Sequence, residues 1–208
     1  LIWGGSAGVI FSFLVEMAVP ASEFVTMAIV APLAEELAKA SVFILVATGA
    51  RKLELTSLTD HIFYAGICAL GFAFVENLGY FALSSSAGEF VVMTLVRTGF
   101  GVFGHPLYTT ATAVGMWAWR NKGGFWKVIL GYVVACLLHG LWNGGPALLA
   151  DSLTLDETGQ LVTMVLVYVV LFVPVFIGTV IMATRNRRKE YEAVRSQLPL
   201  MVEAGLVT

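Results

Sequence analysis

Long apolar segments separated by short polar breaks run along the whole 208-residue chain. A helix needs about 20 apolar residues to cross a hydrocarbon core about 30 Å thick. We therefore predict an all-α fold, a polytopic bundle of six transmembrane helices forming a single membrane domain over residues 1–184, followed by a basic tail over 185–208. The predicted spans are 1–19, 23–49, 61–83, 91–119, 126–150 and 161–184.

The polar breaks alternate in charge along the chain. The basic breaks lie at 51–52, 120–122 and 185–189, and the neutral or acidic breaks lie at 20–23, 84–89 and 151–160. Cytoplasmic loops of membrane proteins carry the excess of Lys and Arg. We therefore expect both termini, and the basic tail, on the cytoplasmic side.

The composition excludes an ordinary soluble domain. Hydrophobic residues make up 58% of the chain and charged residues 12%, whereas soluble domains have about 45–50% and about 25%. The formal net charge of -2 gives no indication of a nucleic-acid partner. The expected environment is the lipid bilayer.

Ionisable side chains lie at similar depth on four consecutive predicted spans, near the middle of three of them and somewhat to the outer side of the third span. Glu35 and Glu36 share the second span, Glu76 lies on the third, His105 on the fourth and His139 on the fifth. A charged side chain at the bilayer centre costs about 3 kcal/mol on insertion scales, so such residues usually pair with one another or mark a functional site. We expect these groups to meet in one buried site.

The two adjacent glutamates are expected to have different tasks. Glu35 and Glu36 point about 100° apart on a helix, and Lys39 lies one turn further along the same span. One glutamate should then face the site, while the other braces a neighbouring helix or pairs with Lys39.

Helical spacing also assigns supporting residues to the other spans. Tyr80 lies one turn after Glu76, and Asn143 lies one turn after His139, so each pair shares a helix face. Asn77 is either a supporting residue of the site or a hydrogen-bonding residue between helices.

Two kinds of hydrolytic chemistry fit this set. A catalytic zinc takes three protein ligands and leaves one position for water. The ligands would be Glu76, His105 and His139. Glu35 or Glu36, with Glu35 preferred, would then be the general base, and Asn143 would stabilise the oxyanion. In the metal-free alternative a glutamate activates water and the histidines hydrogen-bond the carbonyl. These residues alone do not decide between the two.

Four motifs carry a family resemblance. They are Glu35-Glu36-x-x-Lys39, Phe72-x-x-x-Glu76-Asn77-x-x-Tyr80, His105, and His139-x-x-Trp142-Asn143. Together they resemble the PrsW family of intramembrane proteases, a branch of the group that contains the CAAX prenyl endopeptidases and bacteriocin-processing membrane proteases. The resemblance covers residues 30–146. In the CAAX group the paired glutamates supply the water-activating base.

The resemblance implies a substrate and a location. The substrate would be a single-span membrane protein, such as an anti-sigma factor that undergoes site-1 cleavage near the outer side of the membrane. The protein would be a multi-pass protein of a bacterial or archaeal cell membrane.

Two non-enzymatic interpretations stay open at this point. Midplane glutamates and histidines also relay protons or metal ions in transporters and channels, although the chain has no convincing internal repeat of the kind that many transporters have. A membrane scaffold with an inactive site would keep its cellular phenotype after Glu35→Gln.

Overall fold

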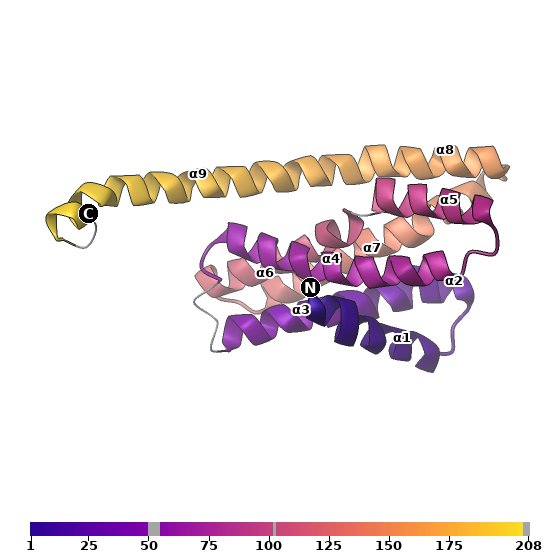
Figure 1. The fold of residues 1–208 in the computed structure, drawn as a ribbon, viewed down its shortest axis with the longest axis horizontal. Helices are drawn as coiled ribbons and strands as arrows, with labels where there is room; N and C mark the ends of the chain where they lie inside the picture. The colour runs from indigo at the N-terminus through magenta and orange to yellow at the C-terminus, as the bar shows by residue number, and fades with distance from the viewer. Residues whose placement is uncertain (50–54, 102, 206–208) are drawn as a thin grey trace.

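A computed structural model describes residues 1–49, 55–101 and 103–205, and these residues form helices and connecting turns without a strand (Figure 1). The elements include short π-helical segments, labelled η. In chain order they are η1 (Gly4–Gly8), α1 (Val9–Ala18), α2 (Glu23–Val25), η2 (Thr26–Val30), α3 (Ala31–Thr48), α4 (Leu58–Ala82), α5 (Ala87–Val96), η4 (Arg97–Gly101), α6 (Gly104–Lys122), α7 (Trp126–Ser152), α8 (Glu157–Val167), η5 (Tyr168–Phe172) and α9 (Val173–Glu203). The predicted all-α membrane fold is confirmed.

Several of the described helices begin where a polar side chain accepts a hydrogen bond from one of the first backbone N–H groups. The hydroxyl of Ser57 accepts from the Asp60 N–H at 3.0 Å, while the Asp60 carboxylate accepts from the Ser57 N–H at 2.8 Å. This reciprocal capping box fixes the start of α4. Ser86 and Asp156 cap α5 and α8 in the same way, through one side-chain acceptor each.

Within the described residues, four helices are long and apolar enough to cross a membrane: Leu58–Ala82, Ala87–Lys122, Trp126–Ser152 and Thr158–Glu203. They coincide with the last four predicted spans, apart from residue 83 at the end of the third span. The helical run through α2, η2 and α3 also has the necessary length, but Glu35, Glu36 and Lys39 occur within every 18-residue stretch of it. The first apolar helix, Gly4–Ala18, is shorter. The count of six spans stays a prediction.

Two of the basic breaks lie at the same end of the bundle. Arg120, near the end of α6, donates to the carbonyl of Leu55, just before α4. Asn186 on α9 lies 3.3 Å from the hydroxyl of Thr59, on the first turn of α4. This common position agrees with the charge alternation along the chain, and the cytoplasmic assignment stays a prediction.

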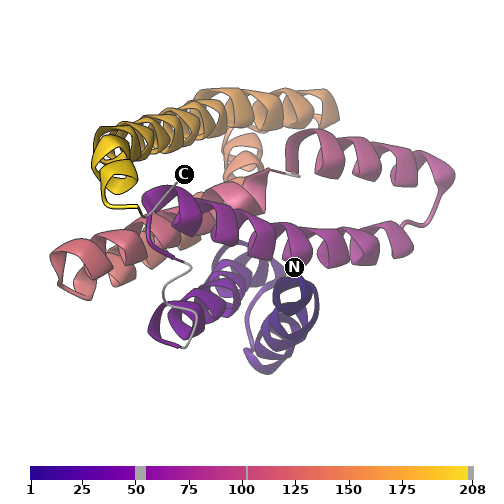
Figure 2. The same ribbon diagram turned by 60° about the vertical axis from the view of Figure 1, so that its left-hand side comes forward.

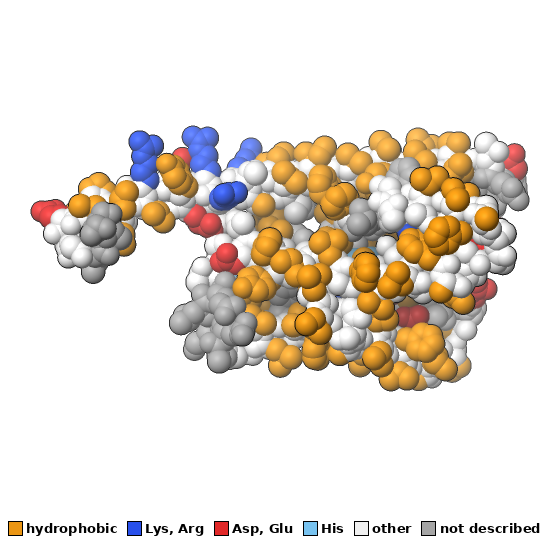
Figure 3. All heavy atoms as spheres, viewed as in Figure 1, with side chains coloured by type: hydrophobic (Ala, Val, Ile, Leu, Met, Phe, Trp, Pro, Cys, Tyr) orange, Lys and Arg blue, Asp and Glu red, His pale blue; other side chains and the backbone are white. Residues whose placement is uncertain are grey.

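The last helix extends well past the bundle. Figure 1 shows α9 continuing beyond the other helices, and Figure 3 shows Lys and Arg side chains on this projecting part, whereas hydrophobic side chains cover the bundle. The predicted boundary between residues 184 and 185 lies inside α9, which runs without interruption to Glu203. The division into a membrane domain and a tail stays a prediction.

Close helix packing brings the site-bearing helices together. A Cβ atom at Gly115 of α6 would lie 2.3 Å from the carbonyl oxygen of Lys127, and one at Gly131 of α7 would lie 2.4 Å from that of Ala111. Glycine is therefore required where these two backbones touch. Figure 2 shows α1 and α3 on one side of α4, whereas α9 lies on the opposite side of α4. The polar residues lie between these layers.

Candidate active site

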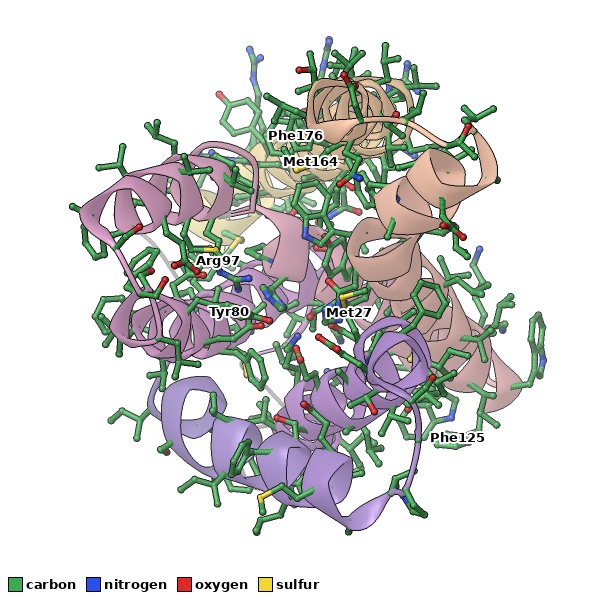
Figure 4. All side chains as sticks on the ribbon, turned by 90° about the vertical axis from the view of Figure 1, so that its right-hand side faces the viewer. Met27, Tyr80, Arg97, Phe125, Met164 and Phe176 are labelled. Carbon is green, nitrogen blue, oxygen red and sulfur yellow. The ribbon has the colours of Figure 1, made fainter. Side chains whose placement is uncertain are left out.

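The predicted ionisable residues meet inside the bundle. Helix α3 contributes Glu35, Glu36 and Lys39, α4 contributes Glu76, α6 contributes His105, and α7 contributes His139. The residues from α3, α6 and α7 are at most 7% exposed. In Figure 4, which looks along the bundle, nitrogen and oxygen atoms gather near the centre of the ribbon.

Glu36 is completely buried, and both of its carboxylate oxygens are hydrogen-bonded. Its Oε1 lies 2.8 Å from Lys39 Nζ and 3.2 Å from His139 Nδ1, and its Oε2 accepts from the Thr109 hydroxyl at 2.8 Å. A buried carboxylate needs such partners to offset the loss of hydration. Glu36 therefore braces α3 against α6 and α7.

Glu35 is held more loosely. Its contacts within the described part of the chain all involve Oε2, which lies 3.4 Å from Lys39 Nζ, 3.7 Å from His105 Nδ1 and 3.8 Å from His139 Nε2. Only the first of these is within hydrogen-bond distance. Glu35 thus faces both histidines while keeping capacity to bind a further group.

Both histidines are oriented by carboxylates. His105 Nε2 lies 2.8 Å from Glu76 Oε2, and His139 Nδ1 lies 3.2 Å from Glu36 Oε1. Neutral histidine has one protonated nitrogen, and a carboxylate partner selects the nitrogen that carries the proton. Lys39 Nζ can only donate, and it lies 2.8 Å from His105 Nδ1, so that nitrogen is the acceptor. His105 Nδ1 and His139 Nε2 are then both unprotonated, and they lie 3.7 Å and 3.8 Å from Glu35 Oε2.

Those two nitrogens and a Glu35 oxygen could hold a metal ion. One possible ligand atom from each of Glu35, His105 and His139 lies within 4.8 Å of the other two, and all three residues are buried. The set of two imidazoles and one carboxylate is typical of catalytic zinc. The residues therefore fit a metal, although Lys39 Nζ, 2.8 Å from His105 Nδ1, would have to give up that contact.

Glu76 does not join this group of three. Its carboxylate lies on the opposite ring nitrogen of His105, which is the position of an outer carboxylate that orients a metal-binding histidine. We predicted Glu76 as a metal ligand and Glu35 as the preferred base, and the structure places Glu35, in place of Glu76, in a group with both histidines. The ligand and base assignments stay predictions.

Arg97 anchors Glu76 from the far side. Its Nη2 lies 2.9 Å from Glu76 Oε2, its Nε donates to Asn77 Oδ1, and its guanidinium lies 3.9 Å from the centre of the Tyr80 ring. The predicted supporting residues Asn77 and Tyr80 therefore act on Arg97 and reach the histidines only through Glu76. Figure 4 labels Arg97 and Tyr80 beside the central polar atoms.

Asn143 forms a hydrogen bond with a backbone carbonyl on another helical segment. Its Nδ2 donates to the carbonyl of Met27 at 3.0 Å and so ties α7 to η2. Met27 is labelled in Figure 4. An oxyanion role would require Asn143 to exchange this bond for one to substrate, and that role stays a prediction.

Sequence reasoning missed two contributors. Thr109 lies one turn after His105 on α6 and donates to Glu36, so the shared helix face could have revealed it. The second is Tyr108, whose ring stacks on His139 with centroids 4.8 Å apart. No spacing rule identifies that stack, because it depends on how α6 and α7 pack.

Comparison of the amino-acid sequence with models of protein families gives a match. The model described as "PrsW family intramembrane metalloprotease" matches residues 1–179. Neither the curated proteins nor the solved structures give a match. The family match covers most of the chain and includes every residue of the buried site.

Proposed function

The chain belongs to the PrsW family of intramembrane metalloproteases, and we propose that it cleaves a peptide bond of a single-span membrane protein with water activated by Glu35. Membership of this family makes the protein a peptidase and implies a metal cofactor. The observation that carries the proposal is the position of Glu35, a loosely held carboxylate whose Oε2 lies 3.7 Å from His105 Nδ1 and 3.8 Å from His139 Nε2.

We assign the metal to His105 Nδ1, His139 Nε2 and Glu35, and we propose zinc because its usual ligands are imidazole and carboxylate. When bound, such an ion polarises the scissile carbonyl and makes a bound water more acidic. Glu36 and Glu76 would hold the two histidines in the tautomers that leave these nitrogens free.

Glu35 also transfers a proton during the proposed reaction. As water adds to the scissile carbonyl carbon, Glu35 accepts one of its protons. When the tetrahedral intermediate collapses, the C–N bond breaks and the same proton passes to the departing amine. The contacts of Glu35 with described residues use Oε2 alone, so Oε1 is the oxygen we assign to this transfer.

Lys39 supplies the positive charge that keeps both carboxylates of α3 buried. It contacts Glu36 at 2.8 Å and Glu35 at 3.4 Å, and its ammonium also lies 4.3 Å from the centre of the Phe72 ring. We propose that it holds the pair in position before substrate enters. Asn143 is proposed to donate to the oxyanion after leaving Met27.

The site's burial among membrane helices supports a substrate that is itself in the bilayer. We propose a single-span protein, an anti-sigma factor by resemblance, cut near the outer face of a bacterial or archaeal cell membrane. Water must reach the scissile carbonyl group in the buried site. We expect the entry of substrate to open a path for this water.

The test is cleavage in proteoliposomes. Purified protein is reconstituted with zinc and a set of single-span peptides that carry anti-sigma factor transmembrane segments, and products are identified by mass spectrometry. We expect wild-type protein to cleave at least one peptide, Glu35→Gln to lose at least about a thousandfold in rate, and the exposed-site control Glu23→Gln to retain activity. Equal rates for the two variants would refute the role of Glu35.

A further inference from the structure

A small aromatic cavity adjoins the active site on the side of α9. Its volume is about 180 Å³, and it lies between α6, α7 and the η5–α9 helix. The walls include Tyr108, Trp142, Phe172, Val173 and Phe176. None of the contacts described for catalysis uses this space.

Tyr108 is the wall that the cavity shares with the active site. Its ring stacks on His139 at 4.8 Å between centroids and meets the edge of His105 at 5.8 Å. Gly104, which also lines the cavity, directly precedes His105. The Tyr108 ring would therefore lie between a group bound in the cavity and the two histidines.

Exposure decreases from the membrane-facing rim of the cavity to its floor. At the rim, Phe103 is 53% exposed and Phe176 is 43% exposed, and their rings lie 5.8 Å apart. At the floor, Phe172 is 3% exposed and Tyr108 is 1% exposed. The cavity thus runs from the lipid-facing side of α6 and α9 (Phe176 in Figure 4) toward the site.

The hydroxyl of Tyr108 is a buried polar group beside Gly104, and both residues line the cavity. It is buried and has no hydrogen-bond partner among the described residues. It lies against Gly104, where an added Cβ would be only 2.6 Å away, so glycine leaves room for it. A buried phenol normally finds a partner, because an unpaired hydroxyl costs about 1–3 kcal/mol.

We propose that this cavity is the subsite for one large apolar side chain next to the scissile bond, and that the Tyr108 hydroxyl donates to a backbone carbonyl of the substrate. The inference rests on the proposed function and adds its side-chain specificity. An apolar protein cavity of about 150 Å³ holds a benzene molecule, so this one suits Leu or Phe. Because the rim faces lipid, a substrate helix could insert this side chain sideways.

The first test is a cleavage profile. Otherwise identical single-span peptides carry Ala, Leu, Phe or Trp at each position flanking the cut, and products are quantified by mass spectrometry. At one position we expect wild-type protein to prefer Leu and Phe over Ala by about tenfold or more. Val173→Phe, which narrows the cavity, should abolish that preference, and Phe172→Ala should extend it to Trp.

The matched control is Val170→Phe, one turn earlier on the same continuous helix and 64% exposed. It makes the same change of side chain outside the cavity, so the profile should stay as in wild type. Identical profiles for the two Val→Phe variants, or no preference in wild-type protein, would overturn the subsite.

The hydroxyl is tested separately with Tyr108→Phe, which keeps the ring stacked on His139. We expect kcat/KM to fall about fivefold for every peptide, as for the loss of one hydrogen bond, with the Leu and Phe preference retained. Unchanged kcat/KM would remove Tyr108 from substrate binding.

A crosslinking measurement separates failure of the subsite from failure of the proposed function. Peptides with the compact diazirine analogue of leucine at each position are irradiated with Glu35→Gln protein, and adducts are mapped by mass spectrometry. We expect adducts on Trp142 and Phe172 from one peptide position, lost with Val173→Phe. If wild-type protein cleaves no peptide but these adducts form, the proposed cleavage of single-span substrates of this kind is wrong and the subsite stands. Adducts confined to other surfaces would refute the subsite whether or not cleavage occurs, leaving lipid as its occupant.

Discussion

Replacing Lys39 by Met is the most informative single change to the buried charges. Met has similar length and can still pack on the Phe72 ring. Three carboxylates, Glu35, Glu36 and Glu76, are arranged around two cations, Lys39 and Arg97. With neutral histidines the substitution changes their combined charge from −1 to −2.

The contact distances give the size of the effect. At an effective dielectric constant of about 20, Lys39 attracts Glu36 at 2.8 Å by about 6 kcal/mol and Glu35 at 3.4 Å by about 5 kcal/mol. Removing the ammonium also removes its own desolvation cost of several kcal/mol, and breaking buried pairs typically costs 3–5 kcal/mol. We expect a loss of about 3–5 kcal/mol.

The assay is thermal unfolding of the detergent-solubilised protein, with and without zinc. Lys39→Met should lower Tm by about 10 °C, and zinc should raise Tm more in the variant than in wild-type protein, because the ion no longer competes with the ammonium for His105 Nδ1. The exposed control Lys122→Met should change stability by less than about 0.5 kcal/mol. Equal Tm values for the two variants, or an equal response to zinc in Lys39→Met and wild-type protein, would refute this electrostatic reasoning.

Three further substitutions test other parts of the site. His139→Ala should lose the zinc that elemental mass spectrometry finds in wild-type protein purified without chelators. Thr109→Val should lower the unfolding free energy by about 1–3 kcal/mol, because Glu36 loses a buried donor, and this is measurable as a lower Tm. Asn143→Ala should lower kcat by about tenfold or more with KM little changed, as for the loss of an oxyanion donor, in a steady-state peptide assay.

A specific result would contradict each of these three predictions. Equal metal content in His139→Ala and wild-type protein would remove His139 from the ligand set. A Thr109→Val variant as stable as the exposed control Thr184→Val would show that the bond to Glu36 contributes little. If Asn143→Ala lowers Tm and leaves kcat unchanged, the residue only ties α7 to Met27.

Much of the architecture follows from the chain itself. Apolar segments of sufficient length must form helices in lipid, because their backbone groups have no water to bind. The cost of burying charge in lipid also predicts that Glu36, Glu76, His105 and His139 meet, and they do. The family resemblance, drawn from motifs at these positions, is confirmed by the match over residues 1–179.

Only the tertiary structure shows which site residues contact each other. Spacing along one helix says which residues share its face, but the rotation of that helix about its axis, and its distance from its neighbours, come from packing. Glu35 therefore faces both histidines, and Glu76 lies behind His105 against Arg97. The sequence determined that acids and histidines would share one membrane-buried site. Only the packing of α3, α4, α6 and α7 decided which atoms of those residues face each other, because contacts between helices depend on angles and distances that no single helix contains.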